Sequence, residues 1–170
     1  MRILLSSLIA VLILAPVANA AEAIELTPEK TAVIKANCVS SQVTLQQIKY
    51  SDAASRVNRG QSYERLMSRL ILPMNSRAAA NGFSSSAANL ASITTRYQQA
   101  LSSFKKHYED YDDALSATLR TKCQTKPADF YKNLVEARKQ RASLSGDVSE
   151  LAQLTENYHQ AVVKLRSEVQ

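Results

Sequence analysis

The densest group of side chains that could do chemistry lies in Ser51–Leu66, SDAASRVNRGQSYERL. Asp52 and Arg56 are spaced i,i+4, so on a helix they share one face and can form an ion pair. If short connections place three helices side by side in antiparallel order, this stretch comes level with His107 and Arg141. We therefore expect a polar layer at mid-height that contains Asp52, Arg56, Arg59, Tyr63, Glu64, His107, Tyr108, Tyr111, Glu136, Arg138 and Arg141.

Two interpretations of this polar layer are open. In the first, the layer binds a polar or anionic ligand between the helices. In the second, it is a hydrogen-bonded layer that fixes the register of the helices, a use known for polar residues at coiled-coil seams. We favour the second interpretation. Gly60 falls on the same side of the helix, opposite His107 of the next helix, and we expect it to allow the close approach of a neighbour.

The sequence contains no motif of catalytic or metal-binding residues. His107 and His159 are far apart and lack the spacing of a helical metal site such as H-E-x-x-H. The acidic run Glu109–Asp113 lacks the glycine turn and the ligand order of a calcium loop. There is no G-x-S-x-G elbow and no phosphate-binding glycine loop. We expect no enzyme activity, no metal and no cofactor.

A second unusual stretch is RLILPMNSR, residues 69–77, in which a proline interrupts a helical pattern. Proline removes one backbone hydrogen bond, so we expect a kink there rather than a helix end. The apolar residues around it cannot all face one narrow core stripe. Some would pack against the next helix, and the rest would be exposed among arginines. Packing of the tip is the simpler interpretation, and the alternative is a partner-binding tip formed by Arg69, Ile71, Leu72, Pro73, Met74 and Arg77.

Three long helices follow from the scarcity of glycine and proline and from the spacing of apolar residues. The first should begin after Thr27, continue past Pro73 and end at Asn81–Gly82. The second should cover about 87–120, and the third should run from near Pro127 towards Val169 with a near-heptad repeat. The expected seam of the third helix contains Phe130, Leu134, Ala137, Leu144, Val148, Leu151, Tyr158, Val162, Leu165 and Val169, with Arg141 and Thr155 at its two remaining positions. The stripe of the second helix contains Leu90, Ile93, Tyr97, Leu101, Phe104, Tyr108, Tyr111, Leu115 and Leu119.

The fold class that these helices predict is all-α. Because both connections are short, we expect an elongated antiparallel up-down-up three-helix bundle with coiled-coil-like packing. Residues 28–170 would form a single helical domain, preceded by a short lead-in at 21–27. A bundle this long and thin buries little core per residue, so dimerisation along a leftover apolar stripe is a further expectation.

Two cysteines test this topology. Reflecting the first helix onto the second through the turn near residue 83 brings Cys38 and Cys123 to the same end of the bundle. An even number of cysteines in an exported chain is typical of a disulfide. The alternatives are a redox pair, which no C-x-x-C spacing supports, and two free thiols. We expect a structural disulfide between Cys38 and Cys123.

The first twenty residues have the pattern of a secretory signal peptide. Arg2 precedes the apolar run Ile3–Leu14, and small residues at Ala18–Ala20 suit cleavage after Ala20. The alternative is an uncleaved N-terminal anchor. We expect export to the periplasm, the cell envelope or the medium. The formal net charge of +6 becomes +5 without Arg2, which is too mild to suggest nucleic acid but is compatible with acidic proteins or peripheral membrane contact.

Five segments carry a resemblance to a known family. They are Asn37–Cys38, SDAASRVNRGQSYERL, LPMNSR, Cys123 with KPADFY after it, and EARKQR at Glu136–Arg141. On these segments the chain resembles small exported helical proteins of ultrasmall, reduced-genome bacteria, a family whose function is uncharacterised. The resemblance covers most of 28–170 and implies export and helices without implying an activity. The layout is also similar, without shared motifs, to periplasmic holdase chaperones of the seventeen-kilodalton type.

These observations predict a secreted or cell-envelope helical interaction protein without catalytic activity, which binds a protein partner or the cell surface. The alternative is a holdase-like chaperone or a carrier module for apolar or anionic ligands. A third class is an enzyme that uses the mid-height polar layer.

Overall fold

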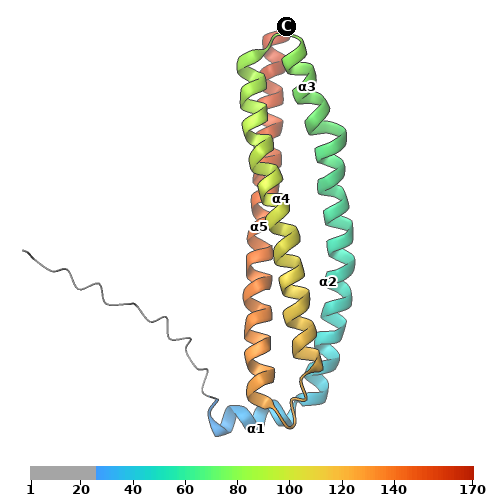
Figure 1. Cartoon of the computed structure of the whole chain (residues 1–170), viewed down its shortest axis with the longest axis vertical. Coiled ribbons are helices and arrows are strands. Elements are labelled where there is room, and N and C mark those ends of the chain that lie inside the picture. Colours follow the sequence, from blue (N-terminus) through green and yellow to red (C-terminus); the bar gives the residue numbers. More distant parts are fainter. Residues whose placement is uncertain (1–25) are drawn as a thin grey trace, which may run out of the picture.

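The computed structural model describes residues 26–170, and this part of the chain is all-α (Figure 1). The expected signal peptide at 1–20 and most of the lead-in at 21–27 lie outside the described residues. Among the residues that are described, no helix has the length and apolar content needed to cross a membrane. The helices are α1 (Pro28–Ala36), α2 (Cys38–Leu66), α3 (Leu72–Ala80), α4 (Ser84–Arg120) and α5 (Pro127–Val169), with a π-helical turn η1 (Met67–Ile71) between α2 and α3.

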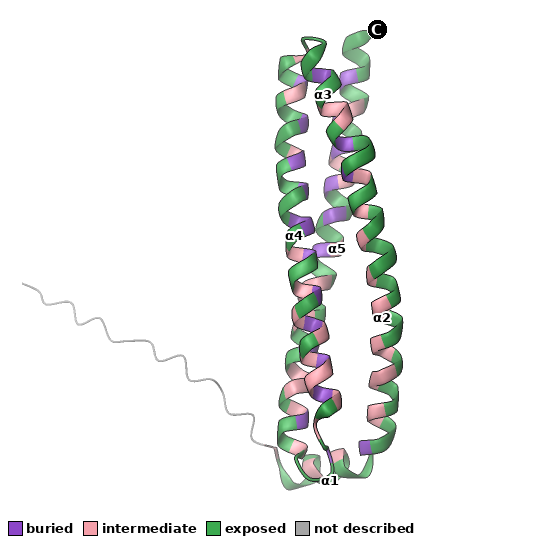
Figure 2. Cartoon of the chain, turned by 45° about the vertical axis from the view of Figure 1, so that its right-hand side comes forward, coloured by how far each residue is buried: buried purple, intermediate pink, exposed green. Residues whose placement is uncertain are grey.

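The α4–α5 hairpin carries most of the core. The two helices pack antiparallel along their lengths, and their buried residues face each other (Figures 1 and 2). The predicted α4 stripe is confirmed, with Ile93 and Leu119 only half-buried. On α5 the buried positions from Asp147 to Leu165 alternate in steps of four and three, which is the heptad spacing of coiled-coil packing. The buried residues of α5 are Phe130, Ala137, Asp147, Leu151, Leu154, Tyr158, Ala161 and Leu165.

The α2–η1–α3 segment forms an arm beside this hairpin. Cys38, at its start, is the single buried residue of α2. The arm converges with the hairpin at both ends and runs beside it between them (Figure 1). At the far end η1 and α3 bury Met67, Ile71 and Ala78 against α4 and α5. The fully buried residues of the arm therefore lie at its two ends.

The first predicted helix is not continuous but is interrupted at Asn37. Its backbone angles of φ −98° and ψ 11° leave the helical range, and its side-chain amide donates a hydrogen bond to the Val33 carbonyl. The side-chain amide thereby provides a hydrogen-bond donor to a carbonyl in the last turn of α1, as asparagine side chains often do at turns. As a result α1 lies across the end of the molecule (Figure 1).

Pro73 does not end the helix, in agreement with the predicted continuation. The helix widens into η1 directly before it, and the Leu72 N–H donates to the carbonyl of Met67, five residues earlier. A π-turn is one way in which a helix accommodates a local disruption, here the missing N–H of proline. The chain then continues as helix α3, which ends before Asn81 and Gly82. Gly82 has φ 82°.

The Cys38–Cys123 disulfide is present and confirms the predicted pairing. Its Cα atoms are 5.6 Å apart, an ordinary separation for a disulfide. Both cysteines are buried and pack with Phe130. The neighbouring Gln42 Nε2 donates to the carbonyls of Leu119 and Thr121 at 3.3 Å each. This end of α2 is thus attached to the hairpin by a covalent bond and by polar contacts.

Candidate binding site

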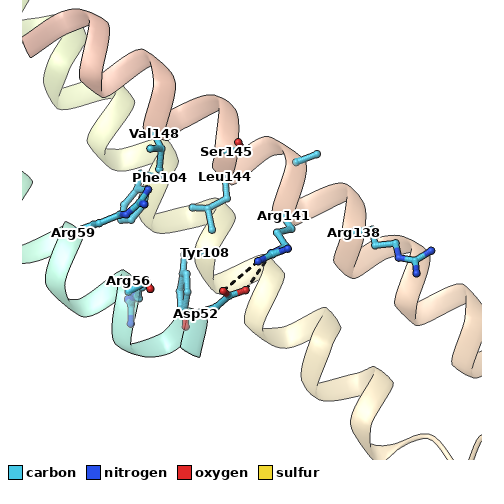
Figure 3. A pocket seen from close by; sticks show the side chains of 12 residues that line it. Asp52, Arg56, Arg59, Phe104, Tyr108, Arg138, Arg141, Leu144, Ser145 and Val148 are labelled. Carbon is cyan, nitrogen blue, oxygen red and sulfur yellow. Dashed lines mark hydrogen bonds and ion pairs between the residues drawn. The ribbon is translucent and has the colours of Figure 1, made fainter. Parts of the chain in front are cut away.

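A polar cluster joins α2, α4 and α5 near the middle of the molecule (Figure 3). The Tyr111 hydroxyl of α4 donates to Oδ2 of Asp52 at 2.6 Å. Arg141 of α5 donates from Nε to the same oxygen at 3.1 Å and from a second nitrogen to Oδ1 at 3.3 Å. This two-pronged geometry is the strong form of an arginine–carboxylate contact. Asp52 therefore links the arm to both helices of the hairpin.

The electrostatics of this cluster favour its paired state. Burial raises the pKa of Tyr111 well above its ordinary value, and its hydrogen bond to Asp52 raises that pKa further. The hydrogen bond to Asp52 also raises the pKa of Arg141. Tyr111 thus stays a donor and Arg141 stays a cation, so both can keep their contacts with Asp52. This geometry fits the register interpretation of the predicted layer.

Arg56 lies one turn along α2 from Asp52 and stacks on an aromatic ring. Its guanidinium carbon is 4.5 Å from the centre of the Tyr108 ring, within cation–π distance. Burial raises the pKa of the Tyr108 hydroxyl, and the negative charge of Asp112 adds to this shift. Stacking holds Arg56 against α4 without neutralising its charge.

A cavity of 610 Å³ opens beside this cluster between α2 and the hairpin. Its basic lining residues are Arg56, Arg59, Arg138 and Arg141, and Asp52 is its acidic one. Apolar lining comes from Phe104 of α4 and from Leu144 and Val148 of α5 (Figure 3). We call this the basic compartment.

A second cavity of 470 Å³ lies nearer the disulfide end. It shares Arg138 and Arg141 with the basic compartment, so the two cavities adjoin. Its apolar lining residues are Leu45, Ile48, Leu115, Leu134 and Ala137. We call this the apolar compartment. The contacts of Asp52 with Tyr111 and Arg141 join α2 to the hairpin where the two compartments adjoin.

Four members of the predicted layer lie outside this cluster. Tyr63 packs edge-on against Phe104 with ring centres 5.4 Å apart. Glu64 forms an exposed ion pair with Lys105 at 2.7 Å, which lowers the pKa of Glu64. Glu136 is exposed and accepts from Gln140 at 2.6 Å.

The fourth is His107, which pairs with Asp147, a residue outside the predicted layer. His107 Nδ1 is 2.6 Å from Oδ2 of Asp147 on α5. Asp147 is buried, and it lies four residues before Leu151 and seven before Leu154 on the same stripe. That heptad spacing was the signal that could have identified it.

Gly60 faces Phe104 rather than His107. A Cβ atom built on Gly60 would lie 3.8 Å from the Phe104 ring, an ordinary contact distance. The expected close approach at Gly60 is therefore not observed.

The predicted tip residues separate into core and surface. Ile71 is fully buried and belongs to the core, while Pro73 and Met74 are half-buried. Arg69, Leu72 and Arg77 are exposed. Leu70, which was absent from the predicted set, is 51% exposed. The surface of the tip therefore consists of Leu70 and Leu72 with Arg69 and Arg77 beside them.

Comparisons with protein-family models, with curated proteins and with solved structures find no match. The resemblance to exported helical proteins of reduced-genome bacteria stays a prediction. Within residues 26–170, no three His, Cys, Asp or Glu side chains gather as a metal ion would require.

Proposed function

We propose that this chain is a cell-envelope interaction protein without catalytic activity, whose α2–η1–α3 arm binds a protein partner. One observation carries the proposal: the arm exposes most of the large apolar side chains that the described surface displays. Nine such side chains are exposed in residues 26–170 and six lie on the arm: Val39, Val43, Tyr50, Val57, Leu70 and Leu72.

The spacing of these residues suits a helical partner. Val43, Tyr50 and Val57 follow one another at intervals of seven, and Val39 lies one turn before Val43. Residues seven apart form a stripe along one side of a helix, which is the seam that coiled coils use. The stripe is exposed, whereas Asp52 and Arg56 of the same helix face the hairpin. A second helix that packed on the stripe would bury it.

The tip adds two more apolar side chains and two arginines to this surface. Leu70 and Leu72 are 51% and 43% exposed, and Arg69 and Arg77 are exposed nearby. Apolar side chains bordered by cations suit a partner that presents apolar residues bordered by carboxylates. We propose that the partner contacts both the stripe and the tip.

The finer architecture forms part of this proposal. The arm would serve as the first helix of an up-down-up bundle with α4 and α5, held to them by the disulfide, the Asp52 cluster and the tip core. Export rests on the signal-like pattern of residues 1–20. N-terminal sequencing of protein from the envelope or medium tests export, and a first residue other than Ala21 would contradict the cleavage site.

Site-specific photo-crosslinking in the producing cells tests partner binding. A photoreactive residue at position 57 or 72 should give a discrete adduct with another protein. The same residue at Val163, which is equally exposed but lies on α5, serves as the matched control. Leu70→Ser together with Leu72→Ser should reduce the adduct formed from position 57 while leaving helical content unchanged. An adduct of twice the chain mass would show a second copy as the partner. Absence of adducts from both arm positions would overturn the proposal.

A further inference from the structure

A third cavity, of 560 Å³, lies at the loop of residues 121–126 that connects α4 to α5, at the same end of the molecule as α1 (Figure 1). We call it the loop cavity. Its lining includes four exposed basic side chains, which come from the end of α4, from the loop and from the start of α5: Arg120, Lys122, Lys126 and Lys132. Since all four line a single cavity, their charges act on the same enclosed space.

The positive charge of the loop cavity is mostly uncompensated. Asp129 is the acidic residue of its lining. This aspartate lies in the first turn of α5, where a carboxylate interacts favourably with the positive end of the helix dipole. Within residues 26–170, none of the four basic side chains forms an ion pair with an acidic group. Four cations against one carboxylate leave a net formal charge of +3 on the lining.

The backbone that carries these side chains is held in place without a ligand. Cys123, which follows Lys122 directly, is fully buried in the disulfide. The N–H of Lys126 donates to the carbonyl of Lys122 at 2.8 Å, which closes the turn of the loop. Asn133 of α5 donates from Nδ2 to the hydroxyl of Thr121 at 3.1 Å. A preformed site loses less conformational freedom when it binds, so this rigidity favours affinity.

The composition and size of the loop cavity select the kind of anion. Its lining residues are all polar or charged, and three of its four cations are lysines. Lysine binds phosphate as a compact point charge, whereas planar carboxylates are recognised best by the fork of arginine. One phosphate monoester carries a charge of about −1.5 to −2 at neutral pH, which is less than the lining can balance. Two linked phosphates match the charge and fill more of the cavity.

We propose that the loop cavity binds a diphosphate group, whose oxygens accept hydrogen bonds from the four basic side chains of the lining. Free diphosphate and the diphosphate headgroup of a lipid share this chemistry. The site is independent of the proposed partner surface, because none of the stripe or tip residues lines the loop cavity. Either proposal can therefore fail without the other.

Isothermal titration of the purified, disulfide-bonded protein tests the site in buffer free of divalent cations. Inorganic pyrophosphate and farnesyl diphosphate are the two probes, and inorganic phosphate and citrate are the comparisons. We expect one pyrophosphate to bind per chain, and both comparisons to bind more weakly by about tenfold or more. Equal affinity of the two probes would show that the diphosphate group alone is recognised. Tighter binding of farnesyl diphosphate would identify a lipid as its source. Absence of pyrophosphate binding, or citrate binding of equal affinity, would overturn the proposal.

Matched lysine variants separate the loop cavity from general attraction to a basic protein. Lys122→Gln with Lys126→Gln should weaken pyrophosphate binding by about tenfold or more, because two charged donors are lost. Lys139→Gln with Lys164→Gln removes the same charge from exposed positions of α5 outside the cavity, and should change binding by less than about twofold. Equal losses in the two pairs would contradict a site at the loop.

Two further variants keep the test independent of the loop conformation. Arg120→Gln with Lys132→Gln changes helical residues and should also weaken binding by about tenfold or more. Asp129→Asn removes the negative charge of the lining and should strengthen pyrophosphate binding. Circular dichroism confirms that each variant is folded. Unchanged binding in the first variant, or weaker binding in Asp129→Asn, would show that the anion does not occupy the loop cavity.

Discussion

The hydroxyl oxygen of Tyr158 lies 3.0 Å from the carbonyl oxygen of Ile71, and this contact joins α5 to the π-helical turn before Pro73. The same hydroxyl is 2.8 Å from Oδ1 of Asn75 in α3, and the amide nitrogen of Asn75 donates to Thr94 of α4 at 2.7 Å. Tyr158 therefore attaches the irregular part of the arm to the hairpin. A buried polar group needs such partners, because an unpaired one costs free energy.

Replacing this tyrosine should loosen the tip. Tyr158→Phe keeps the buried ring but removes the hydroxyl that contacts Ile71 and Asn75, so we expect a loss of about 1–3 kcal/mol in the free energy of unfolding. Urea unfolding followed by circular dichroism measures it. Tyr50→Phe is the matched control, because Tyr50 is 70% exposed and should be neutral. Equal stability of the two variants would mean that the Tyr158 hydroxyl does not hold the tip.

Stability should fall in alkaline solution. Burial raises the pKa of Tyr97 and of Tyr158 to about 12, from an ordinary value of 10.0. Between these values the unfolded chain has lost protons that the folded chain keeps, so the free energy of unfolding decreases as the pH rises. Below about pH 10 the contribution is complete. Urea midpoints measured from neutral pH to about pH 12 should show the decrease, with a smaller slope in Tyr158→Phe. A flat profile above pH 10 would contradict it.

The sequence predicted the hairpin better than the arm, for a physical reason. The α4 stripe could be identified because Leu90, Tyr97 and Phe104 repeat at the helical period, and the structure buries all three. In α5 the predicted seam included Val169, which is 63% exposed, and omitted Leu154 and Ala161, which are buried. Alanine is too small to indicate on which side of a helix the core lies. The seam of α5 was therefore predicted only in part.

The arm was harder to predict because its local signals conflict. Asn37 ends α1 through a hydrogen bond of its own side chain, but asparagine inside a helical pattern is a weak stop signal. Around Pro73 the sequence indicated a bend but could not specify a π-turn, which depends on the packing of Ile71 beneath Tyr158. At the polar cluster, the sequence placed Asp52 and Arg141 in one mid-height polar layer. It could not show that Tyr111 shares the carboxylate, because that depends on rotamers.

Removing the disulfide should destabilise the protein and loosen the part of the arm that begins at Cys38. The bond closes a loop with a sequence separation of 85, for which the chain-entropy model gives about 4–5 kcal/mol. Urea unfolding of Cys38→Ala with Cys123→Ala should show a loss of this order. Faster hydrogen exchange is expected in α1 and the first turns of α2, with little change in the middle of α4. A variant that is as stable as the native chain would show that Gln42 and the Phe130 core suffice to hold this end.

Replacing a glycine by alanine should stabilise the protein at Gly60 and Gly146 and destabilise it at Gly82. Gly60 and Gly146 lie inside helices, and a Cβ atom would meet Phe104 at 3.8 Å in the first case and nothing within 4 Å in the second. Both substitutions should stabilise the protein by about 0.5–1 kcal/mol through helix propensity. Gly82 has φ 82°, where a side chain costs about 1–2 kcal/mol, so Gly82→Ala should destabilise by that amount. Thermal unfolding at neutral pH compares all three variants with the native chain. A loss of stability in Gly60→Ala with none in Gly146→Ala would show that α2 approaches α4 more closely than this contact indicates, and would restore the close-approach role that the sequence suggested for Gly60.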